Sequence, residues 1–268
     1  MEFIEIIKAF ILGIVQGITE WLPVSSTGHL IILEDFIKLN FSEEFIDTFF
    51  VVIQLGSILA VIVLFFNKLN PIKRDKVEQK ETISLWLKIV VATIPAAAIG
   101  LLFEETINEY LYNPLTVAIM LILYGILFIV IENRNIKTKV DNLEGISYKL
   151  AFAIGIFQML ALIPGTSRSG ATIVGGMLLG TSRVVVSEFS FFLAIPTMLG
   201  ASALKMFKMG FSLNALEIMV LVIGSLTAFV VSLWVIKFLL DYIKKHDFKV
   251  FGYYRIILGL LLLAIYLL

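Results

Sequence analysis

Two long apolar stretches of the chain are interrupted near the middle by polar sequence, EWLPVSSTGH at residues 20–29 and IPGTSRSG at residues 163–170. A proline beside small hydroxyl residues and a glycine favours two short helices that meet in a loop. Non-helical backbone at membrane depth is stable only where protein covers it or where it lines a wet cavity. The stretches 6–33 and 150–183 are therefore predicted to be re-entrant helical hairpins, each entering and leaving the membrane on one side.

The composition indicates an integral membrane protein. Of 268 residues, 59% are hydrophobic and 16% are charged, and the mean hydropathy is +0.99. A soluble protein of this length could not bury that much apolar surface in one core. Six further stretches are each long and apolar enough to span a bilayer: 48–66, 83–102, 115–131, 188–204, 215–236 and 250–268. We predict an all-α integral membrane protein with six full transmembrane helices plus the two hairpins.

The distribution of basic residues orients these segments. The connections 67–82, 132–149 and 237–249 contain 13 basic residues: Lys68, Lys73, Arg74, Lys76, Lys80, Arg134, Lys137, Lys139, Lys149, Lys237, Lys244, Lys245 and Lys249. The remaining connections contain three: Lys38, Lys205 and Lys208. By the positive-inside rule the first group is cytoplasmic. All six assignments agree only if the hairpins do not cross the bilayer, and both termini are then outside, with the first hairpin opening outward and the second inward.

The two halves of the chain resemble each other. The pattern AFxxGIxQ occurs at 9–16 and 151–158, FFxxI at 49–53 and 191–195, and SLW at 84–86 and 232–234. Pro23-x-x-Ser26 matches Pro164-x-x-Ser167 after a one-residue gap. Each half contains one hairpin and three spans, and because three is odd the second copy is inverted. Such repeats place their site near the bilayer midplane.

We therefore predict a single membrane domain over residues 1–268. Repeat 1 covers about 1–132, a cytoplasmic linker about 133–149 and repeat 2 about 150–268. Chance similarity between apolar sequences of low diversity is the alternative explanation of the matching patterns.

Charge and composition exclude several classes of function. Lys+Arg and Asp+Glu total 21 each, so the chain lacks the basic excess that nucleic-acid binding requires, and no nucleic-acid partner is expected. The absence of Cys excludes disulfides, thiolate metal sites and a Cys nucleophile. Two His residues are too few for a zinc site of the usual multi-His kind.

The polar residues inside the two interruptions are the candidate functional residues. An ionised side chain at the bilayer centre costs about 2.5–3.5 kcal/mol, so it is a functional candidate by default. Glu20 and Arg168 are predicted to pair where the hairpins meet, with a purely structural ion pair as the alternative. Gln16 and Glu20 share one face of a short helix, as do Ser26 and His29. Further hydroxyl and glycine residues add hydrogen-bond donors: Ser25, Thr27, Gly28, Gly165, Thr166, Ser167, Ser169, Gly170 and Thr172.

This donor-rich set suits a phosphorylated ligand better than a cation or a sugar. Helix N-termini after the breaks would add positive partial charge. A Ser hydroxyl becomes a nucleophile when a base removes its proton, and either His29 or Glu20 can be that base. Alternatively, Glu20 holds a divalent cation against the phosphates.

The sequence QGITEWLPVSSTGH at residues 16–29 resembles the first motif of the bacterial undecaprenyl-diphosphate phosphatases, the bacitracin-resistance family, and PGTSRSGAT at 164–172 resembles the second. VIQLGS at 52–57 and EFSFFLAIP at 188–196 are similar to further stretches of that family. The first motif, written Glu/Gln-x-x-x-Glu, falls on Gln16 and Glu20, and Gln16 weakens any scheme that needs two carboxylates on one metal. The proposed catalytic Ser, His and Arg of the family fall on Ser26, His29 and Arg168.

The resemblance implies hydrolysis of the terminal phosphate of undecaprenyl diphosphate on the outer face of the bacterial plasma membrane. This reaction recycles the lipid carrier for cell-wall synthesis and confers bacitracin resistance. The expected catalytic residues are Ser26, His29, Glu20 and Arg168. The expected substrate-binding residues are Gln16, Ser25, Thr27, Thr166, Ser167, Ser169, Gly170 and Thr172.

The resemblance also implies a divalent cation, Mg or Ca, with Glu20 as its ligand, and no organic cofactor. The expected partners are undecaprenyl diphosphate and membrane lipid, and a homodimer is left open. Paired hairpins in inverted repeats are also a transporter architecture, so a flippase for polyprenyl phosphate is the main alternative function. A proton-coupled carrier that uses Glu20 is a third. A Ser–His pair beside an Arg exceeds what carrying a phosphate needs, which favours the enzyme.

Charged and aromatic residues outside the motifs receive structural interpretations. Arg183 and Glu188 are five residues apart and are interpreted mainly as a structural pair. His246 is interpreted as a surface residue of a charged loop. Five aromatic residues are interpreted as interfacial anchors or packing: Trp21, Trp86, Trp234, Tyr253 and Tyr254.

Overall fold

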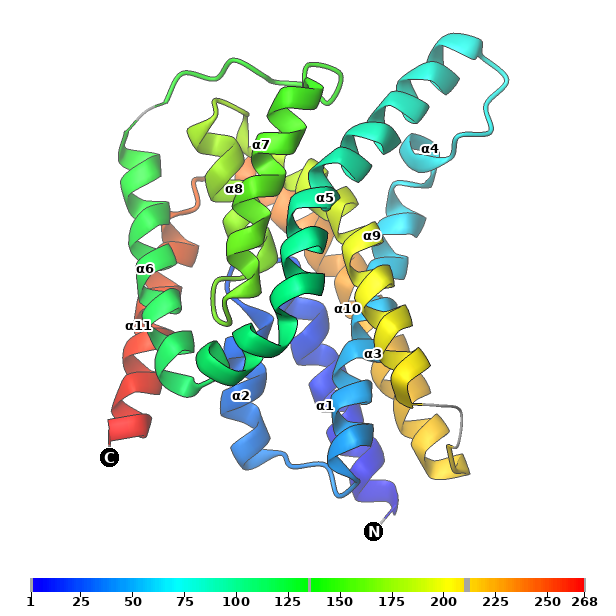
Figure 1. Cartoon of the computed structure of the whole chain (residues 1–268), viewed down its shortest axis with the longest axis vertical. Helices are drawn as coiled ribbons and strands as arrows, with labels where there is room; N and C mark the ends of the chain where they lie inside the picture. Colours follow the sequence, from blue (N-terminus) through cyan, green and yellow to red (C-terminus); the bar gives the residue numbers. More distant parts are fainter. Residues whose placement is uncertain (1, 135, 210–212, 268) are drawn as a thin grey trace.

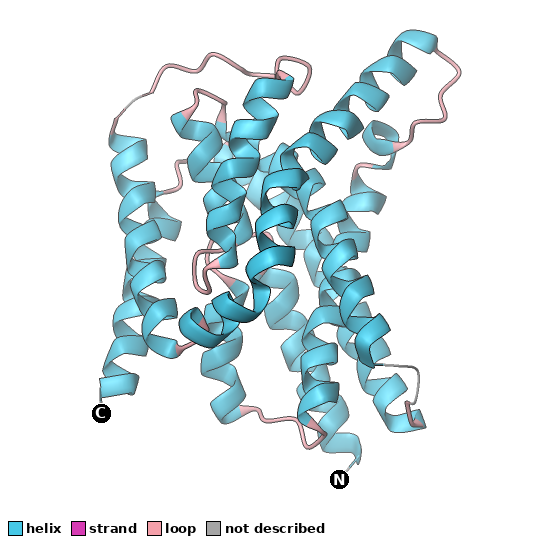
Figure 2. Cartoon of the chain, viewed as in Figure 1, coloured by secondary structure: helices cyan, strands magenta, loops and turns pink. Residues whose placement is uncertain are grey.

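The computed structural model describes residues 2–134, 136–209 and 213–267. Within these residues the regular structure is helical, apart from one isolated parallel bridge between Val140 and Thr181 (Figure 2). The helices, in chain order, are α1 (Glu2–Thr19), α2 (Ser26–Phe36), α3 (Glu43–Leu64), α4 (Phe66–Leu69), α5 (Lys76–Leu111), α6 (Pro114–Asn133), α7 (Tyr148–Met159), the 3-10 helix η1 (Leu160–Leu162), α8 (Arg168–Leu178), α9 (Arg183–Met209), α10 (Ala215–Ile243) and α11 (Lys249–Leu267).

Six segments among the described residues are long and apolar enough to cross a membrane, which agrees with the six predicted spans. They are Glu43–Leu64, Lys76–Phe103, Pro114–Asn133, Arg183–Gly200, Ala215–Ile243 and Lys249–Tyr266. Several helices continue past the predicted apolar cores because backbone hydrogen bonding does not stop where the side chains become polar. The clearest case is α5, which has 36 residues where the sequence predicts a span at 83–102. The predicted all-α membrane protein class is thus confirmed.

Two pairs of shorter helices each run to a turn and back. Residues 20–25 join α1 to α2, whereas η1 and residues 163–167 join α7 to α8. In Figure 1 both turns lie near the middle height of the molecule, and the second helix of each pair returns toward the end from which the first one came. Both termini lie at the lower end in this view.

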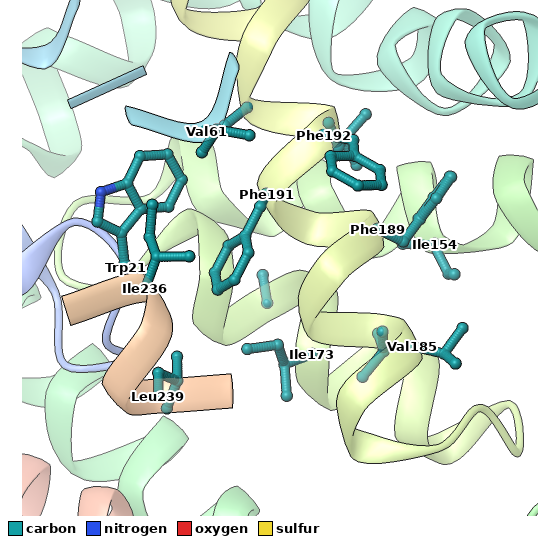
Figure 3. Packing of buried hydrophobic residues seen from close by; sticks show 14 of the residues in the cluster. Trp21, Val61, Ile154, Ile173, Val185, Phe189, Phe191, Phe192, Ile236 and Leu239 are labelled. Atoms are coloured by element: carbon teal, nitrogen blue, oxygen red, sulfur yellow. The ribbon is translucent and has the colours of Figure 1, made fainter. Parts of the chain in front are cut away.

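The largest hydrophobic cluster packs against the first of these turns. Trp21, in the turn, and Phe191, on α9, are both fully buried, and their rings meet edge to face with centroids 5.3 Å apart. Figure 3 shows Trp21 gathered with Phe191 and Ile236 in this cluster. Trp21 therefore anchors the first turn to the core, in agreement with its interpretation as a packing residue.

Two glycines of the AFxxGIxQ pattern allow very close helix packing. A Cβ added to Gly13 of α1 would lie 2.5 Å from the carbonyl oxygen of Gly224 on α10. A Cβ added to Gly155 of α7 would lie 2.3 Å from the carbonyl oxygen of Ala92 on α5. The first short helix of each half of the chain is thus packed against a long helix of the other half, which brings the two turns together.

Candidate active site

The first turn ends α1 and starts α2. Pro23 has no N–H to donate and cannot continue a helix. Ser25 caps α2, and its Oγ accepts a hydrogen bond from the Gly28 N–H at 3.3 Å. Ser25 has a φ of 73°, which residues with a side chain rarely adopt. This cap places Ser26 and His29 on the first turn of α2, where the helix N-terminus carries positive partial charge.

The second turn is built in the same way. Ser167 has a φ of 71° and caps α8, and its Oγ accepts a hydrogen bond from the Gly170 N–H at 3.2 Å. The cap places Arg168 at the first position of α8, as the first cap places Ser26 at the first position of α2. Both helix N-termini therefore carry a site residue at the same position.

The matching caps correct one detail of the sequence comparison. That comparison paired Ser26 with Ser167 across a one-residue gap, whereas the capping geometry pairs Ser25 with Ser167. Ser25 and Ser167 are separated by the same number of residues as the two AFxxGIxQ patterns, so the gap is unnecessary. The predicted gap is wrong because it aligned the prolines, which stand at different distances from the two caps.

Glu20 and Arg168 form an ion pair, as predicted. Arg168 Nη2 donates to Glu20 Oε1 at 3.0 Å, and the side chains of both residues are largely buried. The other carboxylate oxygen, Oε2, accepts hydrogen bonds from Gln16 Nε2 at 3.0 Å and from Ser26 Oγ at 3.3 Å. The carboxylate therefore links the guanidinium to the candidate nucleophile.

Arg168 is held by further contacts on its other side. Its Nη1 donates to the carbonyl oxygen of Ser190 at 2.7 Å and to Ser190 Oγ at 3.3 Å, and its guanidinium lies 5.7 Å from the Trp21 ring. Thr172 Oγ1 donates to the carbonyl oxygen of Arg168 at 2.9 Å and lies 2.7 Å from Ser190 Oγ. Sequence reasoning missed Ser190, although it lies inside the stretch EFSFFLAIP that carries part of the resemblance.

The remaining predicted hydroxyl residues occupy different places. Ser167 Oγ and Ser169 Oγ lie 3.1 Å apart, and Ser169 Oγ donates to the carbonyl oxygen of Leu22 at 3.5 Å, which joins the second turn to the first. Thr166 is fully buried, and the described residues provide no hydrogen-bond partner for its Oγ1. Thr27 is half-buried on the first turn of α2.

His29 lies on the same helix as Ser26 but is bound by other groups. Its Nδ1 lies 2.7 Å from the carbonyl oxygen of Ser25, and its Nε2 lies 2.6 Å from Tyr254 Oη. The Ser26 hydroxyl is directed to Glu20 instead. Of the two candidate bases that the sequence left open, Glu20 is therefore the one in contact with Ser26.

Arg255 on α11 is a site residue that sequence reasoning missed. Its fully buried guanidinium donates to the carbonyl oxygens of Pro23 at 3.1 Å, Gly165 at 2.8 Å and Thr166 at 2.9 Å. It thereby clamps both turns from one side, and it also lies 5.5 Å from the Tyr124 ring. The signal was present in the sequence, since an Arg within an apolar span is a functional candidate by the rule that selected Arg168.

Arg183 and Glu188 do not pair with each other, so that interpretation is wrong. Arg183 binds the buried carboxylate of Glu132, and Glu188 forms an ion pair with Lys68 at 2.7 Å. Five residues along an α-helix turn the side-chain direction by about 140°. The two residues of α9 therefore point to different neighbours. His246 is exposed, as its interpretation as a surface residue requires.

The residues around Glu20 do not form a metal site by themselves. Among the described residues no group of three or more His, Cys, Asp or Glu side chains converges. Both oxygens of Glu20 are already bound, by Arg168, Gln16 and Ser26. A guanidinium bound to the Glu20 carboxylate opposes a second cation there. The donor set fits an anion better than a divalent cation.

Comparison with known proteins places the chain in a defined family. Residues 9–261 match the family described as "Bacitracin resistance protein BacA". The chain is 62% identical to "Undecaprenyl-diphosphatase 1" of Clostridioides difficile, over 100% of this chain and 98% of that protein. It is 59% identical to the "Undecaprenyl-diphosphatase" of Enterococcus faecalis, over 99% of this chain and 98% of that one. It is also 59% identical to the protein of that name from Desulfitobacterium hafniense, over 98% and 96%.

Proposed function

The chain belongs to the bacitracin resistance protein BacA family, and we propose that it hydrolyses undecaprenyl diphosphate to undecaprenyl phosphate and inorganic phosphate. This reaction recycles the lipid carrier for cell-wall synthesis and confers bacitracin resistance. The observation that supports the chemistry best is the chain of contacts from Ser26 through Glu20 to Arg168. Through the carboxylate it joins a hydroxyl at the N-terminus of α2 to a fixed cation at the N-terminus of α8.

In the first half of the reaction, Ser26 Oγ attacks the terminal phosphorus and its proton passes to Glu20 Oε2. The bond between the Ser26 oxygen and phosphorus forms as the bridging P–O bond breaks, and undecaprenyl phosphate leaves. Protonation of Glu20 removes the counter-charge of Arg168, so the guanidinium stabilises the charge that develops on the phosphoryl oxygens. The N–H groups at the starts of α2 and α8 add positive partial charge.

In the second half, water hydrolyses the phosphoserine. We assign His29 as the base for this water, because the first base is then already protonated. The oxygen of the water bonds to phosphorus, the bond from phosphorus to Ser26 Oγ breaks, and Ser26 regains its proton from Glu20. Inorganic phosphate leaves with the proton that His29 took from the water, and the site is restored.

Release of phosphate in detergent tests this function directly. The purified chain in detergent micelles should release inorganic phosphate from undecaprenyl diphosphate, because hydrolysis needs no membrane to cross. A flippase for polyprenyl phosphate would show no release in micelles and would move labelled lipid phosphate across vesicle membranes. That pair of results would replace the proposed function with transport.

We also propose that the two helix pairs are re-entrant hairpins of an inverted repeat, with repeat 1 at about 1–132 and repeat 2 at about 150–268. The packing of the helices supports this repeat, because α1 of the first half packs on α10 of the second half, and α7 of the second half packs on α5 of the first half.

The basic connections at 70–75, 136–147 and 244–248 lie in the upper half of Figure 1, opposite the termini. By the positive-inside rule the termini and the site opening then face outward from the plasma membrane.

Cysteine labelling tests this orientation, because the chain contains no Cys of its own. A membrane-impermeant maleimide on intact cells should label Asn40→Cys, in the α2–α3 connection. It should label Asn142→Cys only after the membrane is opened. Labelling of Asn142→Cys in intact cells would invert the proposed orientation.

The divalent cation remains a separate proposal. Because the residues around Glu20 do not form a cation site alone, a cation would have to arrive with the diphosphate and be held mainly by phosphate oxygens. Chelation followed by titration with Mg or Ca, at several concentrations of substrate, tests this. Dependence of the apparent cation affinity on substrate concentration would support entry as a complex.

A further inference from the structure

The phenol of Tyr254, on α11, contacts the imidazole of His29. Tyr254 Oη lies 2.6 Å from His29 Nε2, and the two rings are nearly parallel, at 7°, with centroids 5.6 Å apart. From the sequence, Tyr254 is interpreted as an interfacial anchor or a packing residue. A contact this short on the second nitrogen of a site histidine indicates a more specific role.

The hydrogen bonds of the imidazole fix which nitrogen carries the proton. The carbonyl oxygen of Ser25, 2.7 Å from Nδ1, can only accept a hydrogen bond, so Nδ1 carries the proton in this arrangement. In the neutral ring Nε2 is then the acceptor, and the Tyr254 hydroxyl donates to it. The nitrogen that can act as a base is therefore the one that the phenol covers.

The position of Tyr254 is itself well defined. The next residue, Arg255, is fully buried and donates to carbonyl oxygens of both turns. The backbone of α11 is thereby tied to the two turns that directly precede Ser26 and Arg168. Tyr254 itself is 44% exposed, which places its ring at the edge of the site rather than in the core.

We propose that Tyr254 is a positioning residue for His29. Its hydroxyl holds the imidazole in place as the Nδ1–H tautomer, so that Nε2 stays unprotonated and can later accept a proton from the hydrolytic water. This role rests on the phosphatase function proposed above. In the free site the phenol occupies Nε2, so His29 does not compete with Glu20 for the proton of Ser26. Because of Tyr254, Glu20 is the base in the first half of the reaction and His29 is the base in the second.

Formation of the phosphoserine intermediate removes the Tyr254 hydroxyl from His29 Nε2. Hydrogen bonds to ionised acceptors are roughly twice as strong as those between neutral groups. Once Ser26 is phosphorylated, one helical turn before His29, the phenol hydroxyl donates to a phosphate oxygen instead of to Nε2. Nε2 then takes a proton from the water whose oxygen bonds to phosphorus, and that proton leaves with the released phosphate. The phenol keeps its own proton throughout.

The test combines kinetics with the chemical reactivity of His29. Tyr254→Phe should lower kcat about tenfold, the effect of one lost hydrogen bond, with little change in KM. The loss in His29→Gln/Tyr254→Phe should be smaller than the product of the losses in the two single variants, because Tyr254 acts mainly through His29. Tyr253→Phe, which removes the neighbouring and more exposed phenol of α11, is the matched control and should leave turnover unchanged.

Diethyl pyrocarbonate, which acylates unprotonated imidazole nitrogens, provides a readout that does not depend on turnover. Tyr254→Phe should raise the rate of modification of His29 severalfold and leave the rate at His246 unchanged. These are the two histidines of the chain, so His246 is an internal reference. An unchanged rate at His29, or additive losses in the double variant, would overturn the role of Tyr254. The proposed phosphatase function would fail separately, by absence of phosphate release from the wild-type chain.

Discussion

The two turns that form the site share a backbone design and differ in chemistry. Each starts an 11-residue helix with a capping serine, Ser25 or Ser167, at a φ near 70°, and each cap binds a glycine N–H three residues later. The first turn carries the groups that transfer protons, and the second carries the fixed cation. The comparison indicates that a common scaffold positions two helix N-termini, while single residues on it determine the reaction.

Replacing Ser26, the first residue of α2, should give the largest loss of kcat, and a much larger one than replacing a serine at the start of α8. Ser26→Ala should lower kcat on the order of 10³-fold or more, since it removes the nucleophile, and should preserve lipid binding. Ser169→Ala, which removes the α8 hydroxyl that donates to the Leu22 carbonyl oxygen, should lower kcat about tenfold, the effect of one lost hydrogen bond. Release of inorganic phosphate by the purified variants measures both. Near-normal hydrolysis by Ser26→Ala would exclude the nucleophile and favour water activated by Glu20.

Replacing the first residue of α8 tests the complementary role. Arg168→Lys should lower kcat on the order of 10²-fold, because an ammonium cannot reproduce the planar contacts to Glu20 and Ser190. Arg168→Met should also destabilise the protein by about 3–5 kcal/mol, since Glu20 is left buried and unpaired.

The double variant Arg168→Met/Glu20→Gln separates the two effects. It should recover most of the stability, measured by thermal unfolding in detergent, because the buried charge is gone. It should recover no activity, because both the cation and the base are missing. Recovery of turnover would mean that the ion pair is structural, which was the alternative open from the sequence.

The pairing of Glu20 with Arg168 was predictable from the sequence, whereas the hydrogen bonds by which Arg255 ties the two turns together were not. A charge in the middle of an apolar stretch is costly, so the sequence identified both residues and their need for a partner. Arg255 carries the same signal, but it binds backbone carbonyls, which have no signature in the sequence. The spans were predictable from hydropathy alone. The partners of Arg183 and Glu188 were not, because they come from helices distant in the chain.

Loss of the clamp should affect both turns, though unequally. Arg255→Met removes one hydrogen bond from the first turn, at Pro23, and two from the second, at Gly165 and Thr166. Hydrogen exchange should therefore accelerate in both turns, more in residues 163–170 than in residues 20–29. We expect kcat to fall about tenfold to hundredfold through misplacement of the reacting groups. Faster exchange confined to one turn would show that Arg255 does not couple them.

The capping serines give the smallest effect and the most direct test of the shared scaffold. Ser25→Ala and Ser167→Ala should each cost about 1 kcal/mol of stability, because the cap is lost while the backbone keeps its positive φ. Ser25→Gly and Ser167→Gly should cost only a few tenths of a kcal/mol, since glycine adopts that φ without strain. Thermal unfolding of the four variants in detergent measures the series. Because φ and the cap distances agree so closely, the two Ala variants should match, and so should the two Gly variants. A clear mismatch at one turn would mean that the surrounding contacts, rather than the capped backbone, hold that turn in place.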